Sequence, residues 1–173
     1  MDDSGRPGCL SCPTGPKDPG YGILPADEGI GLLPWSWAVE RLTRSHDYWL
    51  STVRPDRRPH AMPVWAVWLE NALWFSSGGS SRKARNLALN PWAVITTDDA
   101  LEPVVVEGQA LIVSPVDDSS AVERFAEASN SKYETEYPVQ FFLDNACFRI
   151  APTRVYGLAE ADFTGSPTRW TFD

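Results

Sequence analysis

The sequence predicts a mainly β protein in which six or seven antiparallel strands, with Greek-key-like connections, form a small barrel beside two or three short helices. Short runs rich in valine, threonine and aromatic residues are separated by turn residues, and strands do not alternate with helices as they do in a parallel sheet. The 173 residues are 43% hydrophobic and include 8 tryptophans, which supply a large aromatic area to bury. We therefore expect one compact domain.

The barrel domain is expected to cover residues 34–173. Residues 1–33 contain many of the prolines and glycines, few aliphatic side chains and no hydrophobic periodicity. Such a composition is typical of a poorly ordered or surface-bound tail. The pattern changes at Pro34, where the first amphipathic segment begins.

Three helices are predicted from apolar spacing and from capping residues. The first should run from Pro34 to about Ser45, because apolar residues then recur at helical spacing, at Trp35, Ala38 and Leu42. The second covers residues 81–90 and stops before Pro91. The third follows caps within residues 114–118 and has one face formed by Val122, Phe125, Ala126 and Ser129.

The strands are predicted from β-branched and aromatic runs that turn residues bound. Arg54–Pro59 is expected to be a turn, and Gly108 to mark a bulge. Trp92 and Trp170 are expected to be buried by packing. The predicted strands cover residues 48–53, 61–69, 72–77, 92–97, 104–113, 146–158 and 168–172.

The strand expected at residues 61–69 is apolar on both faces. A sheet with one face in water does not tolerate this pattern, so a helix, a second subunit or a ligand must cover the outer face. We favour a second subunit together with a ligand. Pro63 lies within this strand and cannot donate to a ladder, so the strand is either an ordinary edge or open to a bound molecule at this point.

The segment Ser76–Asn90, SSGGSSRKARNLALN, combines a strand end, a Gly-Gly turn, clustered hydroxyls and a helix start. Its two glycines can take positive φ, which lets backbone N–H groups converge on an anion. The helix N-terminus favours negative charge, and Arg82 and Lys83 would neutralise it. The segment predicts a phosphate cradle, although a Ser-capped helix with basic residues in its first turn is also typical of a solvated surface.

The order and spacing of RPHAMPVW (residues 58–65), SRKARNL (residues 81–87) and VVVEG (residues 104–108) support the cradle. With these motifs, residues 33–172 resemble the flavin/deazaflavin oxidoreductases, the pyridoxamine 5′-phosphate oxidase-like split β-barrels, and in particular their actinobacterial branch that uses coenzyme F₄₂₀. The resemblance implies a split β-barrel that forms a homodimer with the coenzyme at the subunit interface. Trp92 and Trp170 resemble family positions near the dimer interface and the C-terminal strand.

The resemblance also implies which residues bind the coenzyme. The phosphate would be held by Ser76, Ser81, Arg82 and Lys83, with Asn86 capping or orienting the cradle. The ring pocket would be lined by His60, Met62, Pro63, Val64 and Trp65. Arg57 and Arg58 would meet the outer phosphate or the poly-glutamate tail of F₄₂₀, or else belong to a solvated turn. The family usually has a glycine where Arg57 stands, which leaves the turn geometry open.

The sequence contains no Ser-His-Asp arrangement, nucleophile elbow or paired carboxylates, so the chemistry is expected to come from a cofactor. The implied activity is hydride transfer from reduced F₄₂₀ to a planar, apolar, conjugated acceptor, and His60 is the candidate proton donor. Two alternatives stay open. One is an FMN-dependent oxidoreductase, because FMN also carries a ribityl phosphate, and the other is a non-catalytic coenzyme- or haem-binding protein of this fold.

Composition limits the other classes of partner. A net charge of −8 argues against a nucleic-acid or anionic-membrane surface, and no apolar stretch approaches the roughly 20 residues of a membrane helix. The acidic start lacks a secretory signal, so we expect a cytoplasmic protein. Cys9 and Cys12 form a Cys-x-x-Cys pair without two further ligands at similar spacing, and we therefore expect no metal site.

Overall fold

The computed structural model describes residues 13–15, 22–114 and 118–172. These ranges contain the helices α1 (Trp35–Arg44), α2 (Arg82–Leu89), α3 (Ser119–Tyr133) and α4 (Val139–Leu143), and the 3₁₀ helix η1 (Glu160–Asp162). The strands are β1 (Asp47–Val53), β2 (Pro59–Trp65), β3 (Val67–Leu69), β4 (Ala72–Ser77), β5 (Trp92–Thr97), β6 (Val104–Ile112), β7 (Ala146–Gly157) and β8 (Thr168–Thr171). The predicted mainly β fold class is confirmed.

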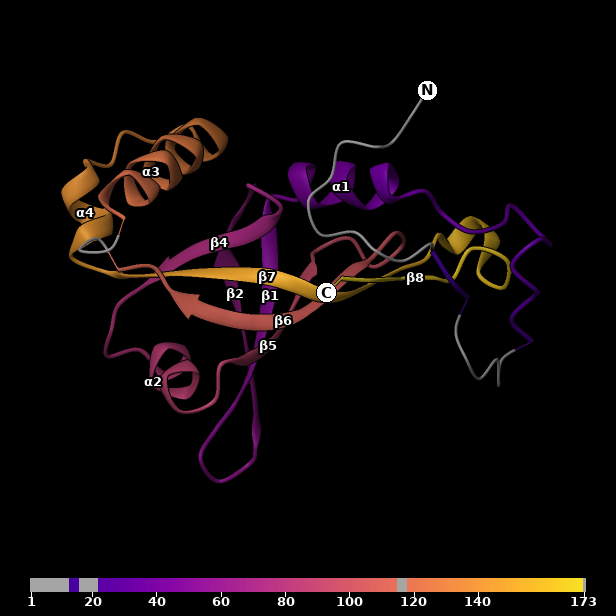
Figure 1. The fold of residues 1–173 in the computed structure, drawn as a ribbon, viewed down its shortest axis with the longest axis horizontal. Coiled ribbons are helices and arrows are strands. Elements are labelled where there is room, and N and C mark those ends of the chain that lie inside the picture. Colours follow the sequence, from indigo (N-terminus) through magenta and orange to yellow (C-terminus); the bar gives the residue numbers. More distant parts are fainter. Residues whose placement is uncertain (1–12, 16–21, 115–117, 173) are drawn as a thin grey trace.

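All named strands belong to one antiparallel sheet that curls into a split β-barrel (Figure 1). The strand order is β2-β1-β5-β6-β7-β4-β3, and β8 pairs with the second half of β7. Strands β2 and β3 therefore stand at opposite ends of the sheet, although only Ala66 separates them in the chain. The chain passes from one end of the sheet to the other at this residue, and this passage closes the barrel.

The prediction of one continuous strand over residues 61–69 is thus wrong, because the structure has two strands there. The first, β2, pairs with β1, and the second, β3, pairs with β4. A single strand cannot keep one partner around a closed, twisted sheet, so the run is broken where the partner changes. The other predicted strands match the observed ones to within one residue at each end.

The predicted bulge at Gly108 is confirmed. The register of β6 against β7 shifts between Glu107 and Gly108. A Cβ atom on Gly108 would lie 2.2 Å from the backbone oxygen of Ala151, so no larger residue fits without a shift of the backbone.

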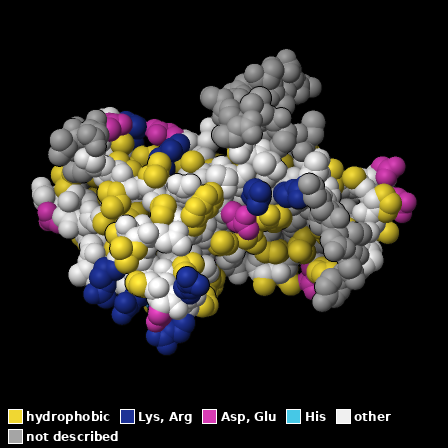
Figure 2. All heavy atoms as spheres, turned by 60° about the horizontal axis from the view of Figure 1, so that its bottom comes forward, with side chains coloured by type: hydrophobic (Ala, Val, Ile, Leu, Met, Phe, Trp, Pro, Cys, Tyr) yellow, Lys and Arg dark blue, Asp and Glu magenta, His cyan; other side chains and the backbone are white. Residues whose placement is uncertain are grey.

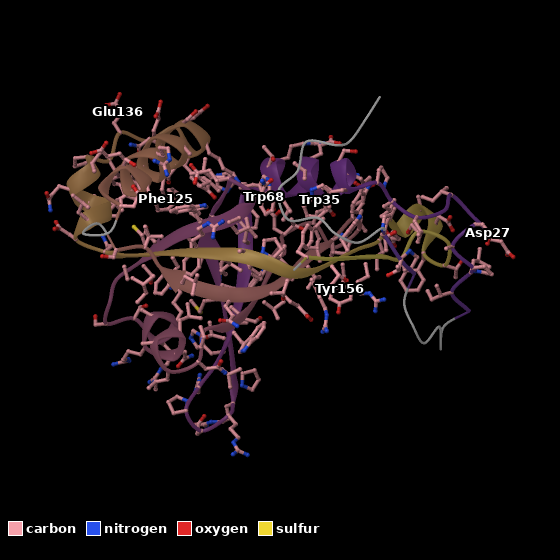
Figure 3. The ribbon with its side chains drawn as sticks, in the orientation of Figure 1. Asp27, Trp35, Trp68, Phe125, Glu136 and Tyr156 are labelled. Carbon is pink, nitrogen blue, oxygen red and sulfur yellow. The ribbon has the colours of Figure 1, made fainter. Side chains whose placement is uncertain are left out.

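Helix α1 covers one open side of the barrel. Its buried residues are Trp35, Ala38 and Leu42, as the spacing predicts. Figure 3 shows Trp35 and Trp68 together between the helix and the sheet, with ring centroids 6.1 Å apart in an edge-to-face arrangement. Trp170 is fully buried and lies 5.6 Å from Trp35 in a similar arrangement, which confirms its expected packing role.

Helices α3 and α4 form a second, smaller core against β3, β4 and β7 (Figures 1 and 3). Phe125 of α3 lies 6.0 Å from Trp74 and 5.3 Å from Phe142 of α4, measured between ring centroids. The sequence pattern does not predict α4, because its five residues are too few to establish a helical period. Trp92 is half exposed on the outside of the sheet, so packing within the single chain does not bury it.

The described part of the N-terminal tail contacts η1, β8 and the connection between them. Thr14 forms an isolated antiparallel bridge with Arg169, and the Ile30 N–H donates to the carboxylate of Asp162 at 2.6 Å. Further towards the barrel, the Leu33 N–H donates to the hydroxyl of Thr168. Cys9 and Cys12 lie outside the described residues, so the expectation for them stays a prediction. No helix in the described ranges is long and apolar enough to cross a membrane.

Candidate coenzyme-binding site

The β1–β2 hairpin extends past α2 at one end of the barrel (Figure 1), and α2 contacts β1. The charges of Arg54 in the hairpin and of Arg82 and Lys83 in α2 all act on His60. Basic side chains gather at this end of the barrel, as the dark-blue patch on the lower part of Figure 2 shows. The patch combines residues of the β1–β2 hairpin with the first turns of α2. The phosphate cradle predicted from the sequence is therefore joined by a second basic segment that is about 30 residues away in the chain.

The loop between β4 and α2 has the hydroxyl-rich form that the sequence predicts. Ser81 is the N-cap of α2, and its Oγ accepts a hydrogen bond from the Ala84 N–H at 3.2 Å. The hydroxyls of Ser77 and Ser81 lie 2.9 Å apart within hydrogen-bonding distance. Ser76, half-buried at the end of β4, stands opposite Cys147 of β7, whose side chain lies in the core below α3 and α4. Ser76 therefore faces the other side of the sheet from Ser77 and Ser81.

The backbone conformation of the two glycines in this loop differs from the predicted one. Neither Gly78 nor Gly79 has positive φ, and the Ser81 N–H closes the turn on the carbonyl oxygen of Gly78 at 2.9 Å. Their contribution is space, since a Cβ on Gly79 would meet no atom within 4 Å. The side chain of Asn145, at the start of β7, borders the loop, with its Oδ1 3.9 Å from the position of a Cβ on Gly78.

Five cationic side chains belong to this end of the barrel, and none forms a salt bridge within the part of the chain that the structure describes. They are Arg54, Arg57, Arg82, Lys83 and Arg85. Like charges held together raise the free energy of the folded protein unless an anion neutralises them. This group of residues is called the cation cluster below, and it is suited to bind an anionic group.

His60 begins the inward face of β2 beside the cation cluster. Its Nδ1 is buried and has no hydrogen-bond partner among the described residues, and the same holds for Nε of Arg54. Burial, followed by the positive charges of Arg54, Lys83 and Arg82, lowers the pKa of His60 below its usual value. The imidazole is therefore neutral at pH 7, with one ring nitrogen left to bind a ligand.

Asn86 lies deeper than the cation cluster and is 1% exposed. Its Nδ2 donates to the hydroxyl of Thr52 at 2.9 Å, and that hydroxyl faces the backbone oxygen of His60 at 3.4 Å. Asn86 therefore links α2 to the β1–β2 pair, in agreement with an orienting role. Its Oδ1 is buried without a donor in the described chain.

The residues expected to line a ring do not share one face of β2. Opposite residues in an antiparallel pair point to the same side, and His60, Met62 and Val64 stand opposite Thr52, Leu50 and Tyr48, whose side chains are buried in the barrel. Pro63 and Trp65 point to the outside. The Val64 side chain is only 7% exposed, so it belongs to the core. Pro63 is accommodated because β2 is an edge strand that pairs with β1 alone.

In the β1–β2 turn, the contacts of Arg58 and Arg54 differ from those expected from the sequence. Arg58 donates twice to Asp56, from Nε at 2.9 Å and from Nη2 at 2.6 Å, so its guanidinium is already paired within the turn. Arg54 instead approaches His60. The strand alternation could have identified it, because Arg54 follows Thr52 by two residues and continues the inward face of β1.

The outside of β1, β2 and β5 carries exposed aromatic residues. Trp49 and Trp92 are each 50% exposed and Trp65 is 47% exposed. An open, largely apolar groove of about 250 Å³ runs over this face and is lined by Ser51, Thr52, Val53, Pro59, Trp92, Ala93, Val94 and Glu107. The groove reaches the same end of β1 and β2 as the cation cluster, so an anionic and an apolar surface adjoin here.

A polar loop at a helix start, a cation cluster and an adjoining aromatic face are consistent with the resemblance in the sequence motifs. A family model described as "Pyridoxamine 5'-phosphate oxidase" matches residues 38–159, which include all of β1 to β7. The chain belongs to this family. The pyridoxamine 5′-phosphate oxidase family is named for an oxidase, so it includes oxidoreductases. Among curated proteins, none matches the sequence.

Solved structures agree with the pyridoxamine 5′-phosphate oxidase fold. A protein described as "conserved hypothetical protein Rv2991" from Mycobacterium tuberculosis is 21% identical, with a TM-score of 0.67 over 82% of this chain and 89% of that one. A protein described as an F₄₂₀ reductase is 24% identical, with a TM-score of 0.53 over 67% and 93%. A haem-binding protein from Mycobacterium smegmatis is 20% identical, with a TM-score of 0.55 over 78% and 62%. At these identities the similarity shows the fold.

Proposed function

We propose that this protein is an F₄₂₀-dependent reductase that transfers a hydride from the reduced deazaflavin to a planar, conjugated, largely apolar acceptor. The cation cluster carries the proposal. A ribityl phosphate, which FMN and F₄₂₀ share, needs two or three of these charges. F₄₂₀ extends this phosphate by a poly-glutamate tail, and a molecule with several negative groups suits five cations that form no salt bridge in the described chain.

Each residue of the site has a distinct part in this proposal. Arg82, exposed at the start of α2, binds the phosphate bidentately, and Lys83 adds a point charge. The hydroxyls of Ser81 and of Ser77, which lie 2.9 Å apart, donate to the same group. Asn86 holds α2 against β1, and its free Oδ1 accepts from a ribityl hydroxyl.

The bound coenzyme supplies the hydride. The protein orients the ring along the free edge of β2 and excludes water from it through Met62 on the inward side and Pro63 and Trp65 on the outward side. His60 is neutral at pH 7 in the free protein, because burial and the neighbouring cations lower its pKa. An anionic coenzyme offsets those cations, which raises the pKa of His60 towards the range in which it can donate the proton that follows the hydride.

We further propose that a second copy of the chain covers the outer face of β1, β2 and β5. The exposed fractions of Trp49, Trp65 and Trp92 are large for indole side chains, and burying them would release water from a wide apolar surface. The partner would complete the ring pocket beside the apolar groove, where the acceptor would bind. Light scattering at working concentration should give twice the mass of 19.2 kDa, and a monomer would contradict this interface.

The proposed coenzyme is tested by parallel titrations of the purified protein with F₄₂₀ and FMN, followed by tryptophan fluorescence. We expect F₄₂₀ to bind at micromolar concentration or tighter and FMN to bind much more weakly. Preference for FMN would identify a flavin enzyme of the same fold. Failure of both to bind, with haem binding instead, would replace the proposal by a non-catalytic role.

A further inference from the structure

Ala66 is buried in the barrel at a position where its backbone groups need hydrogen-bond partners from outside the sheet. It lies between β2, which pairs with β1, and β3, which pairs with β4. Only 1% of its surface is exposed. Neither strand ladder pairs its backbone groups. A buried N–H or carbonyl group without a partner costs roughly 1–3 kcal/mol, so the closure of the barrel requires partners from elsewhere.

The last turn of α3 supplies these partners. The Tyr133 hydroxyl accepts from the Ala66 N–H at 2.8 Å, and its own O–H can donate to the carbonyl oxygen of Ala66 or of His46, each at 2.8 Å. The Lys132 ammonium donates to the same Ala66 oxygen at 2.9 Å and to the Tyr48 hydroxyl at 2.7 Å. Lys132 and Tyr133 together are called the α3 clamp below.

The α3 clamp also sets the direction of Trp65. The Tyr133 ring stacks on the Trp65 ring with a centroid distance of 4.4 Å and an interplanar angle of 5°. The imidazole of His46 meets both rings edge-on. Trp65 is therefore fixed on one side by α3 while 47% of its surface stays accessible on the other.

We propose that Lys132 and Tyr133 are positioning residues, which hold β2 and Trp65 in the geometry that the coenzyme ring requires. This inference rests on the proposed function for its link to the coenzyme. The two residues act at the far end of β2 from the cation cluster, so they touch β2 without touching the phosphate. A helix that is inserted between β6 and β7 thereby controls the strand of the ring pocket.

The chemistry of the α3 clamp fits this task. Burial lowers the pKa of Lys132 to about 8, while Asp98 and Asp47 oppose the shift. Burial raises the pKa of Tyr133 and Tyr48, so both hydroxyls keep their protons over the working pH range. The hydroxyl of Tyr133 is then a permanent donor and acceptor for Ala66.

The test uses the variants Tyr133→Phe and Lys132→Met, with Glu127→Gln as a matched control on the exposed face of α3. Hydrogen exchange is measured for the amides of β2 and Ala66 and compared with those of β5 and β6. Titration with F₄₂₀ and FMN is run on the same samples. We expect exchange at Ala66 and along β2 to be about tenfold faster in both variants, with β5 and β6 unchanged, and coenzyme affinity to fall about tenfold.

The outcomes separate the two proposals. Unchanged exchange along β2 in both variants would overturn the α3 clamp, whatever the coenzyme. Faster exchange with full coenzyme affinity would also overturn the positioning role, because the clamp would then serve stability alone. If the wild-type protein binds no coenzyme, the proposed function fails, and local acceleration along β2 would still support the structural part of the inference.

Discussion

The two ends of β2 carry polar clusters of opposite character. At its start, His60 Nδ1, Arg54 Nε and Asn86 Oδ1 are buried without partners in the described chain, next to cations that pair with no carboxylate. At its end, the α3 clamp satisfies both backbone groups of Ala66. A cluster that is complete by itself has a structural task, whereas a cluster that leaves buried groups and charges uncompensated indicates a binding site.

Two arginines of the β1–β2 turn show the same contrast between paired and unpaired groups. Arg58 is bound to Asp56, and the resulting hydrogen bonds lower the pKa of that carboxyl group. Arg54 forms no salt bridge in the described chain, although its charge helps to lower the pKa of Asp56, and it contributes to the lowered pKa of His60. Two residues of the same type, four positions apart, thus belong to a self-contained turn and to the candidate site, respectively.

The largest effect should come from removing the phosphate contacts. The double variant Arg82→Ala, Lys83→Ala should bind F₄₂₀ or FMN at least about 100-fold more weakly, because charged hydrogen bonds contribute roughly 1.5–3 kcal/mol each. Its thermal unfolding temperature should equal or slightly exceed that of the wild type, since neither side chain forms a salt bridge in the described chain and the neighbouring cations repel both. Arg44→Ala on α1 is the control, because Arg44 is equally basic and exposed but lies outside the cluster. Retained coenzyme affinity in the double variant would exclude the cradle.

A smaller effect should appear in the pH dependence of stability at the other end of β2. Because the pKa of Lys132 is lowered to about 8, the unfolded chain holds the lysine proton to higher pH than the folded protein. The free energy of unfolding should therefore rise between pH 8 and 9.5, by an amount of the order of 1 kcal/mol after allowance for solvent screening. Above pH 10 the buried tyrosines Tyr48 and Tyr133 oppose this gain.

Denaturant titrations of the wild type and Lys132→Met at several pH values measure this effect. The variant should lose the upward slope, while Glu127→Gln keeps it. An identical slope in the wild type and Lys132→Met would show that the ammonium is not destabilised by its surroundings.

The smallest effect concerns Arg57, which adopts a left-handed backbone conformation with φ of 65°. The structure thereby explains why a glycine suits this position of the turn. Replacing Arg57 by glycine should relieve backbone strain and raise the free energy of unfolding by at most about 1 kcal/mol. The same change removes one cation, so F₄₂₀ should bind more weakly while FMN is affected less. Equal losses for both coenzymes would contradict a role of Arg57 beyond the shared phosphate.

Local signals in the sequence predicted most of the fold. The Ser81 cap, the glycine bulge at residue 108 and the apolar spacing of α1 each depend on neighbouring residues, and the structure confirms them. The break at Ala66 could not be predicted in this way, because residues 61–69 contain no signal for a change of partner. Its cause is the long-range geometry of the closed sheet and the α3 clamp, about 66 residues further along the chain.

The candidate site was predicted in part for the same reason. The Ser81 cap and the start of α2 depend on neighbouring residues and are found as expected, but the conformation of Gly78 and Gly79 is not, and the approach of Arg54 depends on strand pairing. The exposure of Trp92 likewise follows from which face of β5 it occupies, and average tryptophan burial does not reveal this. Coenzyme contacts of the named residues stay predictions that binding measurements must decide.

The most direct test of the contrast between the two clusters is the pKa of His60, followed by NMR with and without F₄₂₀. The chain has two histidines, so a His60→Gln sample assigns the signals. The account predicts a pKa below the usual 6.5 in the free protein and a clear rise when the coenzyme neutralises the surrounding cations. A His60 pKa that stays the same while F₄₂₀ binds would show that the coenzyme lies elsewhere and would contradict the account.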